Sequence, residues 1–257
     1  MTKIMAVTNQ KGGVGKTTTT VNLAASLAAV KKRVLLVDLD PQGNATMGSG
    51  INKSDLERTV YDVLLGEATI AQARITSEPG KYDVLPANRE LAGAEIELVE
   101  MEEREIRLKK ELQVIAHEYD YILVDCPPAL NLLTLNGLCA ARSVMIPMQC
   151  EYFALEGLSD LVNTIRKVRE NLNPDLEIEG LLRTMFDPRN SLAQQVSDQL
   201  QQHFGDKVYR TVIPRNVRLA EAPSFGVPAL CHDAQSKGTQ AYLALAGELL
   251  NNAAGMN

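Results

Sequence analysis

The sequence of 257 residues contains no tryptophan, few aromatic residues and no long apolar run. Aromatic residues make up 4% of the chain, too few for the stacking platforms that bind single-stranded nucleic acid. No apolar segment approaches the about 18 residues that a membrane-spanning helix needs. The N-terminal sequence MTKIMAVTN has no apolar signal-peptide core, so we expect a cytoplasmic protein.

Cysteine and histidine are scarce and scattered. No CxxC pair and no zinc-ligand spacing occurs, and no Ser/His/Asp constellation can be assembled from the spacing. We expect the cysteines to be reduced and mostly buried. The residues concerned are Cys126, Cys139, Cys150, Cys231, His117, His203 and His232.

The charge balance is acidic, with 26 Lys+Arg against 32 Asp+Glu and a net charge of −6. This excludes a histone-like polycation but leaves room for a local basic patch. The hydrophobic content of 45% excludes intrinsic disorder. At this length, we predict a single domain over residues 1–257.

Short runs of Val, Ile and Leu alternate with helical segments. The runs are almost continuously apolar, which is typical of strands covered on both faces. We predict strands at residues 4–8, 33–38, 121–125, 143–148 and 178–185. We predict helices at residues 17–30, 88–118, 155–168 and 239–250. This alternation predicts an α/β fold with a doubly wound, mostly parallel sheet flanked by helices, whose ligands bind at the carboxyl ends of the strands.

A glycine-rich loop follows the first predicted strand and opens a helix. Its end, Gly15-Lys16-Thr17, fits the P-loop pattern G-x-x-x-x-G-K-[ST], although Gln10 stands where the first glycine would be. The glycines let backbone N–H groups face a phosphate, and the start of the helix favours an anion. Lys16 can reach the β- and γ-phosphates, and the Thr17 hydroxyl can ligate Mg²⁺. The predicted phosphate-binding residues are Lys11, Gly12, Gly13, Val14, Gly15, Lys16, Thr17 and Thr18.

Three aspartates follow two of the predicted strands. Asp38 ends the strand at 33–38 and Asp40 follows it, and we expect both to project near the phosphate loop, whereas Asp125 ends the strand at 121–125. Because Mg²⁺ prefers oxygen ligands, we expect Asp125 beside Thr17, directly or through a water, with Asp40 as a second water-mediated candidate. Asp40 is also the candidate to orient or deprotonate the attacking water. The alternative for Asp40 and Asp125 is a structural strand-end or turn role.

The loop and several distant segments resemble one family. KGGVGKTT carries an additional lysine, Lys11, and resembles the deviant Walker A motif of ParA/MinD ATPases. LLVDLDPQGNAT, ILVDCPPAL, QCEYFALEGL, TMFDPRNSLAQQV and TVIPRNVRLAEAPSFG extend the resemblance, over nearly the whole chain, to ParA/Soj-type chromosome or plasmid partition ATPases. The resemblance implies a P-loop NTPase that uses ATP/ADP and Mg²⁺. It further implies an ATP-dependent homodimer that binds double-stranded DNA non-specifically, with hydrolysis stimulated by a ParB-type centromere-binding protein.

The resemblance also assigns roles to individual residues. Lys11 is the signature lysine that reaches the nucleotide of a partner subunit, Asp40 is the hydrolysis carboxylate, and Asp125 is the Walker B residue. Lys16 and Thr17 hold phosphate and Mg²⁺. Matching segments place Met185, Pro214 and Asn216 at adenine, and Arg189 and Arg218 at DNA.

Charge is segregated along the chain. Lys207–Arg218 has four basic residues and no acidic one, whereas residues 88–118 hold nine Glu against five Lys/Arg. The basic run suits phosphate contacts, although ordinary solvated arginines remain the alternative. The tail at 242–257 has Glu248 as its only charged side chain, so we expect no membrane-binding helix of the MinD type. Because the first strand begins by about Lys3, we also expect no helix-turn-helix domain before it.

Two other functions remain open at this stage. The first is an ATPase that positions a protein cargo or complex rather than DNA. The second is a P-loop metabolic enzyme, such as a dethiobiotin-synthetase-like ligase or a nitrogenase-iron-protein-like reductase, which would need cysteines that bridge an iron–sulfur cluster. If DNA is the ligand, the protein is expected to associate with the nucleoid. The sequence does not distinguish a chromosomal from a plasmid system.

Overall fold

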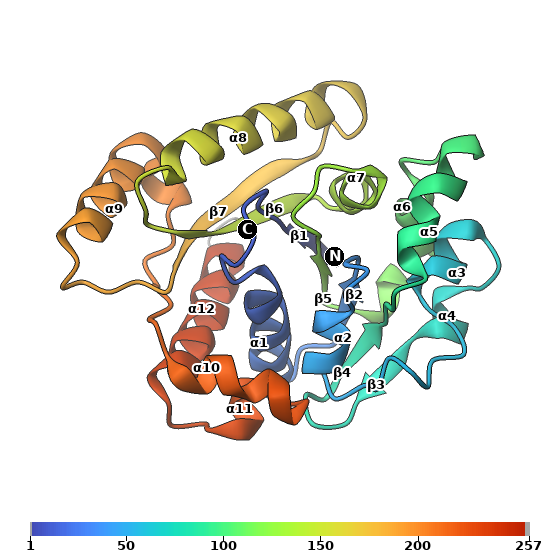
Figure 1. The fold of residues 1–257 in the computed structure, drawn as a ribbon, viewed down its shortest axis with the longest axis horizontal. Coiled ribbons are helices and arrows are strands. Elements are labelled where there is room, and N and C mark those ends of the chain that lie inside the picture. Colours follow the sequence, from blue (N-terminus) through green and yellow to red (C-terminus); the bar gives the residue numbers. More distant parts are fainter. Residues whose placement is uncertain (1, 255–257) are drawn as a thin grey trace.

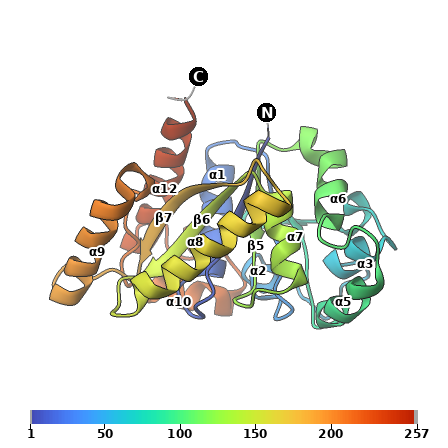
Figure 2. The same cartoon turned by 90° about the horizontal axis from the view of Figure 1, so that it is seen from above.

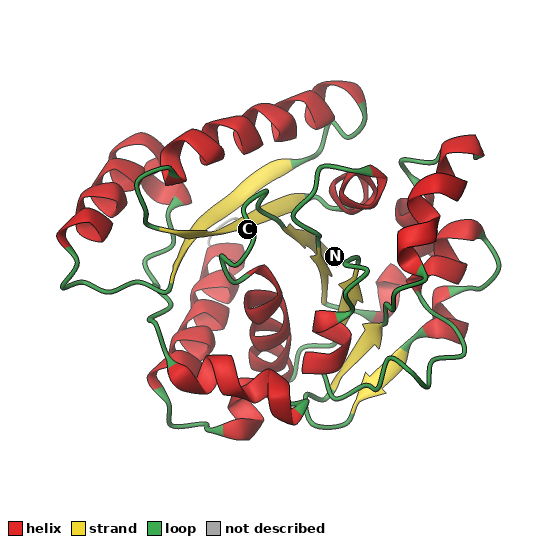
Figure 3. Ribbon diagram, in the orientation of Figure 1, coloured by secondary structure: helices red, strands yellow, loops and turns green. Residues whose placement is uncertain are grey.

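The computed structural model describes residues 2–254 and contains a seven-stranded sheet between two layers of helices (Figures 1 and 3). The strand order is β3-β4-β2-β5-β1-β6-β7, and β3 alone is antiparallel to its neighbour. The strands are β1 Lys3–Val7, β2 Val34–Asp38, β3 Ile75–Ser77, β4 Tyr82–Leu85, β5 Tyr121–Asp125, β6 Ser143–Gln149 and β7 Glu177–Thr184. The predicted doubly wound, mostly parallel α/β sheet is therefore confirmed.

Helices cover both faces of this sheet. In Figure 1, α1 and α12 lie on one face, α7 and α8 lie on the other, and α3 to α6 gather beside β3 and β4. The helices are α1 Lys16–Ala29, α2 Asn44–Gly48, α3 Val60–Leu65, α4 Ile70–Ala73, α5 Leu91–Glu97, α6 Arg107–Ile115, α7 Leu132–Ala140, α8 Ala154–Asn171, α9 Ser191–Phe204, α10 Val217–Glu221, α11 Ala229–His232 and α12 Lys237–Ala254. The loops that follow the parallel strands form the carboxyl edge of the sheet, between the two layers of helices.

Each central strand contributes to two hydrophobic cores. In β5, Ile122 and Val124 pack into the core under α7 and α8, whereas Leu123 packs into the core under α1 and α12. Side chains alternate between the faces of a strand, so a strand covered on both sides needs apolar residues at nearly every position. This explains the continuous apolar runs in the sequence.

One sequence-based prediction of secondary structure is wrong. Residues 88–118 do not form one helix, because the chain leaves the helix after α5 and a short 3-10 turn at Leu98–Glu100 and re-enters it at α6. Met101 is extended and Glu103 is left-handed at φ 53°. The Asn136 side chain of α7 fixes the break, donating to the Arg104 carbonyl at 2.7 Å and accepting the Leu108 N–H at 3.1 Å.

Two expectations about composition can be compared with the described residues. Cys126, Cys139 and Cys150 are buried, as expected, whereas Cys231 is exposed. Between residues 2 and 254, no helix combines the length and apolar character required to cross a membrane. Of the C-terminal tail at 242–257, residues 242–254 continue α12, and residues 255–257 lie outside the described part of the chain.

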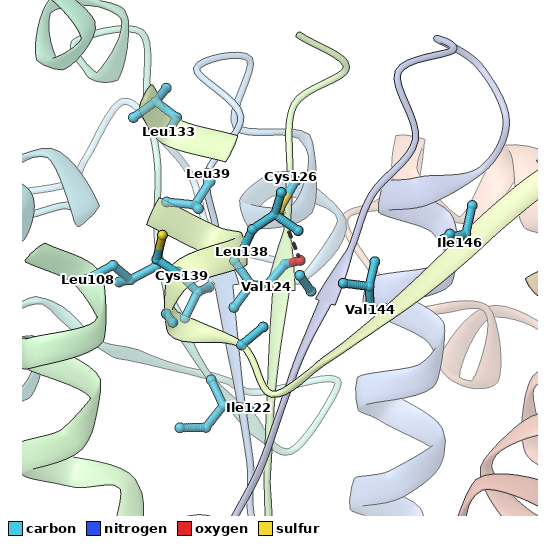
Figure 4. Close-up of a cluster of buried hydrophobic side chains, with 14 of the residues drawn as sticks. Leu39, Leu108, Ile122, Val124, Cys126, Leu133, Leu138, Cys139, Val144 and Ile146 are labelled. Carbon is cyan, nitrogen blue, oxygen red and sulfur yellow. Dashed lines mark hydrogen bonds between the residues drawn. The ribbon is translucent and has the colours of Figure 1, made fainter. Parts of the chain in front are cut away.

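Helix α7 packs closely on β5 at one face of the sheet. Figure 4 shows its Leu138 and Cys139 among Leu108, Val124 and Cys126. At Gly137, an added Cβ would lie 2.8 Å from the Cys126 Sγ atom and 3.2 Å from a Leu39 methyl carbon. The absence of a side chain therefore allows α7 to approach β5.

We expect Gly137→Ala to destabilise the protein by about 1–2 kcal/mol, because overpacking costs about 1–3 kcal/mol and exceeds the helix-propensity gain of about 0.5–1 kcal/mol. Gly247→Ala is the matched control, since Gly247 is also inside a helix but a Cβ there meets nothing within 4 Å. It should stabilise the protein slightly. Urea unfolding measures both, and equal effects would contradict the packing argument.

Candidate ATP-binding site

The predicted site residues converge at the carboxyl edge of the sheet. A cavity of about 430 Å³ lies between the loop before α1, the segment after β2 and the segments around Thr184 and Pro214. Figure 2 shows α10 and the first turn of α8 along this same edge. Most of the predicted residues line the cavity, namely Gly12, Gly13, Gly15, Lys16, Thr17, Thr18, Asp40, Met185, Pro214 and Asn216. Lys11, Val14 and Asp125 are not among the lining residues.

The loop backbone has the curvature that phosphate binding requires. Gly13 and Gly15 are left-handed at φ 73° and 88°, a conformation that strains residues with a side chain. Gly15 is the N-cap of α1 and has no side chain to cap the helix. The first N–H groups of this 14-residue helix therefore face the cavity together with the positive end of its dipole.

Lys16 is held inside the loop. Its side chain is nearly buried, at 7% exposure, and its ammonium donates to the Lys11 carbonyl at 3.0 Å. Burial lowers the pKa of Lys16, and the charges of Asp125 and Asp40 oppose this shift. A bound phosphate would stabilise the ammonium in the same way as these carboxylates do.

Asp125 is fully buried and bonded to two hydroxyls of α1. Thr17 donates to its Oδ2 atom at 2.8 Å and Thr20 donates to its Oδ1 atom at 3.1 Å. Burial, and next the charge of Asp38, raise the pKa of Asp125. A hydroxyl and a carboxylate this close are the oxygen donors that Mg²⁺ prefers, so Thr17 and Asp125 fit a magnesium site. Sequence reasoning missed Thr20, whose only signal was its place in a run of four threonines.

Asp40 is the carboxylate that faces the cavity. It follows β2 by two residues, and its Oδ1 atom accepts the Gln42 N–H at 2.9 Å within its own turn. Asp38 is fully buried and does not line the cavity. The two aspartates of the same segment therefore have different surroundings, which the sequence did not distinguish.

Lys11 does not line the cavity of the chain that carries it. Its ammonium pairs with Glu151, just after β6, at 2.5 Å, and both side chains are about half exposed. This arrangement leaves Lys11 accessible at the edge of the loop rather than in contact with its own phosphate site. Glu151 was not among the predicted residues.

The far end of the cavity combines two segments that are distant in sequence. Met185 is left-handed at φ 48°, an uncommon and strained conformation for methionine. Phe186 bridges to Pro214, and Thr184 donates to the Val14 carbonyl of the loop at 2.7 Å. These contacts bring Met185, Pro214 and Asn216 next to the phosphate loop. Arg215 also lines the cavity, although its position in the basic run indicated a DNA role.

The two candidate DNA-binding arginines lie outside the cavity and are paired with carboxylates. Arg189, 89% exposed, contacts Asp187 at 2.8 Å. Arg218 contacts Glu221 at 2.9 Å and Asp233 at 3.3 Å. Their charges are therefore partly balanced by nearby carboxylates, which were not predicted from the sequence.

We expect Asp125→Asn to stabilise the nucleotide-free protein and to weaken binding of Mg-ATP, because the amide keeps the shape but removes a buried charge beside Asp38. Since the pKa of Asp125 is raised above its ordinary 3.8, the folded state holds a proton that the unfolded state releases. The stability of the wild type therefore rises as the pH falls from alkaline values toward 3.8. Thermal melts at about pH 8.5 and about pH 5.5 should show the larger advantage of the variant at the higher pH. A variant less stable at both pH values would contradict this.

Comparisons with known proteins agree with this geometry. A family model described as an AAA domain matches residues 2–178, more than half of the chain. The sporulation initiation inhibitor protein Soj of Bacillus subtilis (strain 168) is 57% identical over 252 residues, which cover 98% of this chain and 100% of that protein. The chromosome partitioning protein ParA of Caulobacter vibrioides (strain NA1000 / CB15N) is 53% identical over 251 residues, 97% of this chain and 94% of that protein.

A solved structure of a protein described as cobyrinic acid a,c-diamide synthase, from Mycobacterium smegmatis with bound ADP and magnesium, has the same fold. Its TM-score is 0.88 at 38% identity, and the match covers 100% of this chain and 97% of that one. The sequence motifs, the loop geometry and the two curated relatives point to one conclusion. The chain belongs to the ParA/Soj family of chromosome-partitioning ATPases.

Proposed function

We propose that this protein is a DNA-partition switch driven by Mg-ATP. In this account ATP joins two copies, the dimer binds double-stranded DNA without sequence preference, and hydrolysis stimulated by a ParB-type partner releases it. The observation that carries the proposal is the division of roles at one sheet edge. Lys16, Thr17 and Asp40 face the cavity, whereas Lys11 stands outside it beside Glu151.

The cavity residues account for the nucleotide step. The N–H groups at the start of α1 and the Lys16 ammonium bind the phosphates, and the cavity wall at Met185, Pro214 and Asn216 receives the base. Thr17 and Asp125 hold Mg²⁺, which neutralises phosphate charge when bound. Asp40 orients the attacking water or accepts its proton. Hydrolysis then rests on groups that the fold positions around the loop.

Lys11 accounts for the dependence of dimerisation on ATP. One lysine balances only part of a triphosphate's charge, and Lys11 does not line its own cavity. Supplied to the nucleotide of a second copy, it would pair with a phosphate, a stronger partner than the half-exposed Glu151. Loss of the γ-phosphate removes that partner, so the dimer separates after hydrolysis.

DNA binding follows from dimerisation and brings the protein to the nucleoid. Exposed ion pairs are weak, so DNA phosphates can exchange with the carboxylates beside Arg189 and Arg218. One copy offers few contacts, and the net charge of −6 opposes long-range attraction. Two copies present both sets of arginines at a high effective concentration.

The names of the relatives favour DNA over the alternatives. A ParA chromosome partitioning protein and Soj share 53–57% identity with this chain over nearly its whole length, whereas the synthase structure shares 38%. An iron–sulfur reductase would need exposed cysteines near the nucleotide, but Cys126 and Cys139 are buried. Positioning of a protein cargo remains the alternative if DNA binding is absent.

Asp40→Ala and Lys11→Ala should block different steps. We expect Asp40→Ala to bind ATP and accumulate as a dimer, with hydrolysis slowed by about 10²- to 10⁴-fold, because a positioned general base is lost. Lys11→Ala should bind ATP and remain monomeric. Light scattering with ATP measures both masses. A monomeric Asp40→Ala protein or a dimeric Lys11→Ala protein would count against the scheme.

Removal of a DNA-contacting arginine should change the salt dependence of binding. The log–log slope of affinity against salt is about −0.9 per phosphate neutralised, so Arg189→Ala or Arg218→Ala should flatten it by about one to two units. The control is Arg58→Ala, since Arg58 matches Arg218 in exposure, at 50% against 48%. Arg58 also pairs with a nearby carboxylate, Asp62, as Arg218 pairs with Glu221. Fluorescence anisotropy with ATP provides the slopes, and unchanged slopes in both variants would show that the surface is elsewhere.

A further inference from the structure

A buried carboxylate beside the cavity has no role in the proposed function. Asp38 is the last residue of β2, is 0% exposed, and lies opposite Asp125 in the register of β2 and β5. Burial raises the pKa of Asp38, which means that its charge is costly in this position. An apolar residue could fill the same space in the core without that cost.

Three donors from one segment converge on this carboxylate. The Asp40 N–H reaches its Oδ1 atom at 3.1 Å. The Thr46 N–H and the Thr46 hydroxyl reach its Oδ2 atom at 2.9 Å and 2.8 Å. The Thr46 oxygen in turn accepts the Ala87 N–H, from the segment after β4, at 2.9 Å. Both carboxylate oxygens are therefore bonded without contact with the cavity.

These bonds fix both ends of the segment that carries Asp40. Asp40 begins this segment, and Thr46, in the first turn of α2, ends it. The turn between them is closed by the Gly43 N–H, which donates to the Asp40 carbonyl at 2.8 Å. With both ends tied to Asp38, the backbone of Asp40 is restrained, and Asp40 lines the cavity from this position.

We infer that Asp38 is a positioning residue for hydrolysis, whose buried carboxylate, through the Asp40 N–H and Thr46, holds Asp40 in its place at the cavity. The inference rests on the proposed role of Asp40. It assigns Asp38 no contact with nucleotide, metal or water. Misplacement of a catalytic group by about 1 Å can cost about 10²-fold in rate, which sets the scale of the expected effect.

The test uses Thr46→Val, which keeps the side-chain shape but removes the hydroxyl, together with Asp38→Asn. We expect kcat for ATP hydrolysis to fall by about 10- to 100-fold, while the Kd for a fluorescent ATP analogue stays within about threefold of the wild type. Both variants should accumulate as the ATP-bound dimer. Thr46→Ser, which retains the hydroxyl, should recover most of the turnover lost in Thr46→Val.

A second buried hydroxyl, that of Ser49 just after α2, provides the control. Ser49 bonds to the Ala45 carbonyl and to Tyr82 rather than to Asp38, so Ser49→Ala should leave kcat unchanged. The inference is overturned if folded Thr46→Val keeps the wild-type kcat, or if kcat and nucleotide affinity fall together. If Asp40→Ala itself hydrolyses ATP normally, the proposed function fails. If only Asp40→Ala is impaired, the proposed function stands and the inference about Asp38 fails.

Discussion

The site depends on two buried carboxylates at the ends of adjacent parallel strands. Asp38 and Asp125 are register partners in β2 and β5, and each binds donors from a different segment. Asp125 holds the start of α1 through Thr17 and Thr20, and Asp38 holds the Asp40 turn through Thr46. The sheet thus sets the separation of the phosphate loop and Asp40, the proposed hydrolysis carboxylate, because both are tied to the same pair of strands.

This arrangement has a cost in stability that suits a nucleotide switch. Burial raises the pKa of both carboxylates most strongly, and the charge of Asp38 raises the pKa of Asp125 further. A cation bound beside Asp125 would relieve that cost. Binding of Mg-ATP therefore stabilises the folded protein more than it would at a site made of neutral groups. The strained Met185 at the other end of the cavity is a second place where local stability is reduced at a functional edge.

Much of the fold could be predicted because its signals are local. Strands buried on both faces give continuous apolar runs, and the glycine loop before α1 has a fixed pattern. The break between α5 and α6 was missed because a distant side chain, Asn136, fixes it. The pairs of Lys11 with Glu151 and of Arg218 with Asp233 were also missed, since these partners meet only through the tertiary fold. The pairs of Arg189 with Asp187 and of Arg218 with Glu221 are local, and they were not predicted from the sequence either.

The different roles of Asp38 and Asp40 illustrate the same limit within the site. The two residues are alike in type and nearly adjacent, yet Asp38 is directed into the core and Asp40 into the cavity. Side chains alternate along a strand, but the chain leaves the strand after Asp38, so alternation no longer decides where Asp40 points. In the structure, the hydrogen bonds of the turn hold Asp40 in place instead.

The most direct test of the whole account is co-sedimentation of the protein with random-sequence DNA of plasmid length at low salt. It would be run with ATP, with ADP and without nucleotide, all in the presence of Mg²⁺. The account predicts strong retention with ATP alone, since only ATP joins two copies and doubles the phosphate contacts. Equal retention in all three conditions, or no retention with ATP, would contradict it.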